Sequence, residues 1–181
     1  MVERVQARAP GTRPEAPASE RRVRWVRMDG LHLTLRFLGP TDPDRLAAVG
    51  EAVRRTAAAA APFDIVLSGA GGFPNPRRPR TLWIAAREGV GELALLDAAV
   101  DREVARAGWE LDRRPFVPHL TLARSDGVAG GSETLRLLVE AARGLEVPWH
   151  VDRLVLFESI TGGGPARYEP MLSVPLSGTQ E

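Results

Sequence analysis

Hydrophobic and polar residues alternate with a period of two along Leu31–Leu38, the most informative stretch of the chain. This alternation predicts a β-strand with one buried face. Successive side chains of a strand point to opposite sides, so we expect His32, Thr34 and Arg36 together, about 7 Å apart, on the face away from the leucines. A similar phrase returns 87 positions later as His119-Leu120-Thr121-Leu122-Ala123-Arg124. The chain is therefore expected to contain two strands that each present a histidine and a threonine on one face.

The rest of the pattern predicts strands and helices in a mixed order. Apolar residues with a period near 3.6 predict helices from a capping-box-like start at Thr41 to a stop at Pro62, over residues 92–107, and from about 132 to 143. Short apolar runs predict further strands at 23–26, 63–67, 81–85, 151–158 and 168–175, with a Gly/Pro/Arg loop at 68–80.

The order of these elements repeats once. Each His-Thr strand is followed by a turn, an amphipathic helix and another strand, which indicates an internal duplication. We therefore predict an α+β fold that is bilobal, with two antiparallel sheet-and-helix lobes related by a pseudo-two-fold duplication around a central cleft. Residues 1–22 are rich in Arg, Pro, Ala and Glu without hydrophobic periodicity and are predicted to form a flexible basic tail, so the two-lobed domain is placed at 23–181.

Composition limits the possible chemistry. The 181 residues carry a net charge of +1, so bulk charge alone does not indicate a nucleic-acid or membrane partner. The absence of cysteine excludes disulfides, thiolate nucleophiles and cysteine-based zinc sites. No apolar run approaches about 18 residues and no signal-peptide pattern follows the N-terminus, so we expect a cytoplasmic protein without a membrane partner.

Each His-Thr phrase also has an ordinary structural interpretation. A histidine in a strand is usually solvated, and threonine is simply a good strand former. Two copies in corresponding positions, in a chain with three histidines, favour a shared chemical role for His32 and His119 instead. The third histidine, His150, has no threonine two places on and is expected to be a surface residue.

These phrases carry a family resemblance. Trp25-Val26 and the run from Gly30 to Gly39 are followed in order by Gly72-Phe73-Pro74, residues 79–83, residues 116–124, Leu156-Phe157-Glu158-Ser159 and Arg167-Tyr168-Glu169-Pro170. The set resembles the LigT-like two-histidine phosphoesterases and, more narrowly, the RNA 2′,3′-cyclic phosphodiesterases. The resemblance implies a bilobal α+β fold with one His-x-Thr in each lobe and catalysis without a metal or cofactor. The apolar strand that opens the family pattern has no counterpart here, because residues 5–10 are not strand-like.

The residues suit the opening of a cyclic phosphate by water. Imidazoles, with an unperturbed pKa of about 6.5, can take a proton from water or give one to the departing ribose oxygen. Thr34 and Thr121 would donate hydrogen bonds to the phosphate oxygens. The resemblance implies that His119 acts as the base, that His32 acts as the acid, and that Arg124 binds phosphate. Strand parity points Arg124 away from His119, so a twist at the strand end would be needed.

Several further residues have two interpretations. Arg36 and Phe37 are candidate substrate-binding residues, and Phe73 or Trp83 could stack on a base or belong to the core. The arginines at 77, 78 and 80 could guide RNA or form a solvated loop.

The expected substrates are RNA ends or small cyclic nucleotides, and we expect a monomer. Two other functions fit the same residues. One is an enzyme that acts on 2′–5′ linkages or small cyclic nucleotides, including RNA ligation. The other is an inactive module that binds RNA ends.

Overall fold

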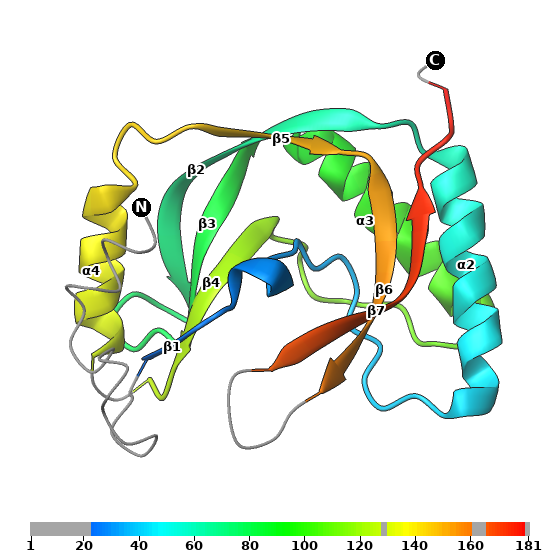
Figure 1. Cartoon of the computed structure of the whole chain (residues 1–181), viewed down its shortest axis with the longest axis horizontal. Helices are drawn as coiled ribbons and strands as arrows, with labels where there is room; N and C mark the ends of the chain where they lie inside the picture. Colours follow the sequence, from blue (N-terminus) through cyan, green and yellow to red (C-terminus); the bar gives the residue numbers. More distant parts are fainter. Residues whose placement is uncertain (1–22, 128–129, 161–165, 180–181) are drawn as a thin grey trace.

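In the computed structural model, residues 23–127, 130–160 and 166–179 are described, and the predicted tail at 1–22 lies outside them (Figure 1). The strands are β1 (Val23–Trp25), β2 (Phe63–Phe73), β3 (Thr81–Glu88), β4 (His119–Ser125), β5 (Val147–Val151), β6 (Arg153–Ile160) and β7 (Arg167–Pro175). The helices are α2 (Leu46–Ala59), α3 (Val90–Arg106) and α4 (Gly131–Ala141), with 3-10 turns η1 (Met28–Gly30) and η2 (Pro43–Arg45).

The larger sheet has five antiparallel strands in the order β1-β4-β3-β2-β5. Leu82, Ile84 and Ala86 alternate along β3 and are buried, as expected for a strand with one core-facing side. They form the first core with Leu135 and Leu138 of α4, which packs against β2 at one end of the molecule (Figure 1). The other side of β3 and β4 is left free to carry the candidate site.

A second layer is built on the β6–β7 hairpin, which is a separate two-stranded sheet. Val49, Val53 and Ala57, spaced along one face of α2, pack into a second core with residues of α3, β6 and the chain's C-terminal segment. These helices lie at the opposite end of the molecule from α4 (Figure 1). The predicted α+β class is confirmed. The two sheets differ in size, five strands against two, and the internal duplication stays a prediction.

The stretch 31–38 does not form the regular strand that its alternation predicts. Among the described residues it pairs with the sheet only through a bridge between Leu33 and Leu120, on the same edge of β4 that β1 occupies. The turn η1 interrupts this path between β1 and Leu33. Leu31 and Leu33 pack on the first core, whereas Leu35 and Leu38 pack on the second. The stretch therefore crosses from one core to the other, and it leaves the sheet before a ladder can form.

Three other boundaries differ from the sequence prediction. β2 continues through the expected loop as far as Phe73, because it pairs with β3 along that length. β5 was not predicted, and it covers the free edge of β2 with mostly exposed residues that lack a clear alternation. The Thr41 hydroxyl donates to the Gly39 carbonyl at 3.1 Å and does not cap a helix, so the capping-box prediction is wrong. No helix among the described residues is long and apolar enough to span a bilayer.

Candidate active site

An antiparallel bridge between Leu33 and Leu120 brings the two His-x-Thr phrases side by side. Both leucines pack in the first core. Because side chains alternate along an extended backbone, the residues on either side of each leucine point away from that core. The antiparallel pairing sets His32 beside Thr121 and, by the same geometry, the second histidine beside the first threonine. Each histidine thus has the threonine of the other phrase as its neighbour.

The two imidazoles are held in the same way. His32 Nδ1 lies 2.8 Å from the carbonyl oxygen of Gly30, and His119 Nδ1 lies 2.6 Å from that of Val117. A carbonyl oxygen only accepts hydrogen bonds, so Nδ1 carries the proton in both rings. Nε2 is then left for substrate, as an acceptor when the ring is neutral and as a donor when it is protonated.

Two aromatic rings flank each histidine. The aromatic neighbours of His32 come from the β6–β7 hairpin, and those of His119 come from β2 and β3. The centroid distances are 4.4 Å for Tyr168 and 5.2 Å for Phe157 from His32, and 5.0 Å for Phe73 and 6.0 Å for Trp83 from His119. Each imidazole also contacts a backbone carbonyl through Nδ1. Each is therefore fixed both by a hydrogen bond and by packing.

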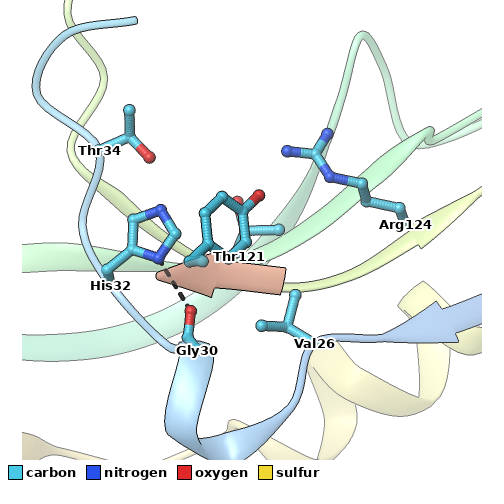
Figure 2. Close-up of a pocket in the computed structure, with 7 residues that line it drawn as sticks. Val26, Gly30, His32, Thr34, Thr121 and Arg124 are labelled. Carbon is cyan, nitrogen blue, oxygen red and sulfur yellow. Dashed lines mark hydrogen bonds between the residues drawn. The ribbon is translucent and has the colours of Figure 1, made fainter. Parts of the chain in front are cut away.

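A small pocket lies over the paired phrases (Figure 2). It is lined by Val26, Gly30, His32, Thr34, Thr121, Arg124 and Tyr168. His119 is not among the lining residues, but it lies two positions before Thr121 on β4 and so projects from the same face of that strand. The pocket therefore combines an imidazole, the hydroxyls of two threonines and a tyrosine, and a guanidinium, which suits an anion.

A β-bulge brings Arg124 into this pocket. Trp83 pairs with Thr121 and Thr81 pairs with Arg124, so a step of two residues in β3 faces a step of three in β4. Leu122 is the extra residue. Three residues apart in a regular strand, Thr121 and Arg124 would point to opposite sides; across the bulge they share one side. Figure 2 shows the Arg124 guanidinium turned toward the space beside Thr34 and His32.

Arg36, predicted to bind substrate, lies elsewhere. Its Nη1 is 3.3 Å from Asp101 Oδ1 and 3.2 Å from Asp112 Oδ2, and its Nη2 donates to the Glu110 carbonyl. The side chain is only 11% exposed and does not line the pocket. Partial burial and the charges of Asp101 and Asp112 raise the pKa of nearby Asp97 to about 6. Arg36 therefore links the Leu31–Leu38 stretch to α3 through an ion pair and does not face the pocket.

The remaining candidates are spread over the surface. Phe37 is 67% exposed and does not line the pocket. His150 is exposed on β5 and its Nδ1 lies 2.7 Å from Asp64 Oδ1, which is consistent with a surface role. The arginines at 77, 78 and 80 are exposed in the loop between β2 and β3.

Sequence reasoning missed the part played by Tyr168. This residue lines the pocket and packs edge-on against His32, although it is far from both His-x-Thr phrases in the chain. It stands in the phrase Arg167-Tyr168-Glu169-Pro170, which carried part of the resemblance. That phrase was the available signal, but nothing in its residue types indicates a neighbour of a histidine.

Comparisons with known proteins identify relatives of this chain. A family model described as the 2′-5′ RNA ligase superfamily matches residues 5–163. A curated relative from Geobacillus stearothermophilus, named RNA 2′,3′-cyclic phosphodiesterase, is 37% identical over 163 residues, which cover 87% of this chain and 49% of the relative. A relative of the same name from Aeropyrum pernix is 35% identical over 118 residues, covering 65% of this chain and 66% of the relative. The chain thus spans about half the length of the first relative and somewhat less than two thirds of the second.

Solved structures resemble the fold over nearly its whole length. A crystal structure of a Thermus thermophilus protein superposes with a TM-score of 0.72 at 28% identity, covering 99% of this chain and 91% of that one. Escherichia coli LigT, crystallised with 3′-AMP, gives a TM-score of 0.64 at 26% identity, covering 98% of this chain and 93% of that one.

Proposed function

The chain belongs to the 2′-5′ RNA ligase superfamily, and from this premise we propose that it is an RNA 2′,3′-cyclic phosphodiesterase. Its substrate is an RNA end that carries a 2′,3′-cyclic phosphate, and its product is a 2′-phosphomonoester. The observation that carries the proposal is the matched pair of imidazoles, each with Nδ1 bound to a carbonyl and Nε2 left for substrate. Several relatives bear the name of this activity.

The reaction needs one neutral and one protonated imidazole. Nε2 of His119 accepts a proton from water as the water oxygen forms a bond to phosphorus. The bond from phosphorus to the ribose 3′ oxygen breaks, and the Nε2 proton of His32 passes to that oxygen. The antiparallel pairing of the two phrases supports the use of two histidines, because it brings them from two separate segments to one region of the fold.

The phosphate is held by neutral and charged donors. The hydroxyls of Thr34 and Thr121 and the guanidinium of Arg124 line the pocket, so they donate to the non-bridging oxygens as negative charge builds on them. A guanidinium matches a phosphate with two parallel N–H donors, which fixes orientation as well as charge. With the phosphate fixed, only one of its two ester oxygens faces His32, and one product isomer should dominate.

Incubation of purified protein with an RNA oligonucleotide ending in a 2′,3′-cyclic phosphate tests the proposal. His32→Ala and His119→Ala should each lower kcat by roughly 10²–10⁴, the usual contribution of a positioned acid or base. His150→Ala is the matched control, because this exposed histidine pairs with Asp64, does not line the pocket and should keep wild-type activity. Near-full activity in either of the first two variants would remove that histidine from the mechanism.

The product identifies the bond that breaks. Treated RNA should resist a phosphatase that acts only on 3′-phosphates and should yield to a nonspecific phosphatase. A 3′-phosphate, or an equal mixture, would contradict the arrangement of acid and base given above. A 2′–5′-linked dinucleotide belongs in the same assay, because faster turnover of that substrate would assign the site to 2′–5′ linkages instead.

A further inference from the structure

Five exposed arginines gather where β1, β4 and the loop between β2 and β3 meet. This basic rim consists of Arg24, Arg77, Arg78, Arg80 and Arg124. None of the five forms an ion pair with a carboxylate among the described residues. Some arginines elsewhere on the described surface do form such pairs, for example Arg27 with Asp29 at 2.9 Å, whereas Arg87, Arg102, Arg113 and Arg143 do not. This one edge of the sheet therefore carries five arginines without a carboxylate partner among the described residues.

Arg24 and Arg124 are direct partners in this rim. They are opposite each other in the β1–β4 register, so their side chains project from the same face with Cβ atoms about 5 Å apart. The neighbouring pair, Val23 and Ser125, is buried on the other face. Two like charges directly opposite each other destabilise a strand pair. An anion bound between them would remove that repulsion.

The pair lies next to the candidate active site. Arg124 and Val26 both line the pocket; Val26 directly follows β1, and Arg24, two residues before it, projects to the same side at a spacing of about 7 Å. The Arg80 carbonyl accepts a hydrogen bond from Ser125 N at 2.9 Å, which fixes the start of β3 beside the end of β4. Positive charge thus extends from the pocket along the sheet edge.

The loop between β2 and β3 adds two more exposed arginines, Arg77 and Arg78, to this edge. The Asn75 side-chain oxygen accepts hydrogen bonds from the backbone N–H groups of Arg77 and Arg78, both at 3.1 Å. This turn holds the loop backbone and leaves both guanidinium groups exposed. An elongated polyanion fits such a row of charges better than a single small anion does.

We propose that Arg24, with Arg124 opposite it, forms a second phosphate site that binds the internucleotide phosphate next to the reacting cyclic phosphate. The proposal rests on the function proposed above and specifies its substrate, an RNA end in preference to a mononucleotide. An oligonucleotide carries this second phosphate and a nucleoside 2′,3′-cyclic phosphate does not. Arg124 contacts the reacting phosphate as well, so Arg24 is the residue that separates the two substrate classes.

Kinetics on two substrates test this site. One is uridine 2′,3′-cyclic phosphate, and the other is the dinucleotide UpU ending in a 2′,3′-cyclic phosphate. Arg24→Gln should lower kcat/KM for the dinucleotide roughly tenfold, mainly by raising KM, because one charge-assisted contact to phosphate is lost. The loss on the mononucleotide should be at least five times smaller. Arg24→Lys should recover part of the dinucleotide rate, since it keeps the charge.

The control is Arg27→Gln, which removes an exposed arginine three positions away that pairs with Asp29. It should leave the ratio of the two kcat/KM values as in the wild type. The salt dependence of dinucleotide KM should also become shallower in Arg24→Gln, by about 0.7 in the log–log slope, as expected for one phosphate contact fewer on a single strand. Equal losses on both substrates, or no loss on the dinucleotide, would overturn the second phosphate site.

Binding separates this proposal from the reaction itself. If the wild type hydrolyses neither substrate, the proposed function fails, and fluorescence anisotropy with a fluorescein-labelled tetrauridylate then tests the site alone. A roughly tenfold weaker Kd in Arg24→Gln but not in Arg27→Gln would support the site. Equal Kd values in both variants and the wild type would overturn it.

Discussion

Replacement of Gly71 by alanine should disturb His119 without touching it. Gly71 pairs with Trp83 in the β2–β3 register, and the six-membered ring of the indole occupies the space that a Cβ at position 71 would need. A Cβ atom at position 71 would be 2.3, 2.4 and 2.8 Å from three carbons of the Trp83 ring. Ordinary carbon contacts begin near about 3.5 Å, so the ring must move by roughly 1 Å. The indole belongs to a cluster of three rings, with centroids 5.0 Å from Phe73 and 6.0 Å from His119, and Phe73 and His119 are 5.0 Å apart, so its movement is passed on to both.

The cost of this movement has two parts. Overpacking of a closely packed site costs about 1–3 kcal/mol of unfolding free energy, which corresponds to a fall in Tm of roughly 2–10 °C for a domain of this size. Displacement of the imidazole adds a catalytic loss, because a misplacement of about 1 Å can cost up to about 100-fold in rate. We expect Gly71→Ala to lower kcat by about 10- to 100-fold on a cyclic-phosphate RNA end.

Urea unfolding and steady-state kinetics measure the two parts separately. Gly91→Ala is the matched control, because a Cβ there meets no atom within 4 Å and the residue lies in α3; it should be neutral or more stable by up to about 1 kcal/mol. Wild-type stability of Gly71→Ala would refute the reasoning about the indole. Lower stability with unchanged kcat would show that Trp83 only packs and does not position His119.

Two further predictions concern pH. Because His32 and His119 must be in opposite protonation states, the profile of kcat/KM against pH should be bell-shaped between pH about 5 and 9, with limbs that belong to the coupled pair, and EDTA should not inhibit; a flat profile, or activity that depends on added metal, would contradict two-histidine catalysis. The pKa of Asp97 is raised from 3.8 to about 6 by partial burial, then by the charges of Asp101 and Asp112. The stability contributed by its protonated form is present below pH about 4 and lost as pH rises through about 6. Asp97→Asn keeps the neutral form, so it should raise the free energy of unfolding at pH 7 by about 1 kcal/mol, allowing for solvent screening, and by little at pH 4; an equal gain at both pH values in urea titrations would contradict the raised pKa.

Local periodicity predicts much of the framework because it depends on neighbouring residues. The spacing of Val49, Val53 and Ala57 predicts the buried face of α2, and Gly108, with φ of 95°, ends the α3 segment where a glycine is expected. The stretch 31–38 alternates as a strand does, and its alternation does place His32 and Thr34 on one side. Its hydrogen-bond partner is a matter of tertiary structure, so the pattern could not show that only Leu33 pairs.

Arg36 and Arg124 mark the limit of parity arguments. Both follow a His-x-Thr phrase, and a regular strand would turn Arg36 toward the site and Arg124 away from it. In the structure Arg124 lines the pocket and Arg36 does not, and residue spacing alone could not predict this. A bulge at Leu122 turns Arg124 into the pocket, and carboxylates of α3 and the following segment draw Arg36 out of the sheet face. A bulge depends on the register between two strands, and an ion pair depends on where a distant helix packs.

The surroundings of the two histidines suggest why unequal sheets can serve one reaction. His32 is flanked by rings of the two-stranded sheet and His119 by rings of the five-stranded sheet, yet each donates Nδ1–H to a carbonyl two residues earlier in the chain. The carbonyl fixes the tautomer locally, and the aromatic rings fix the plane of the imidazole from outside its own segment. The proposed acid–base exchange requires an equivalent Nε2 on each side of the phosphate, and the local arrangement leaves Nε2 of both rings free of the carbonyl contact that Nδ1 makes. The number of strands behind each histidine can then differ without changing the chemistry that the pair performs.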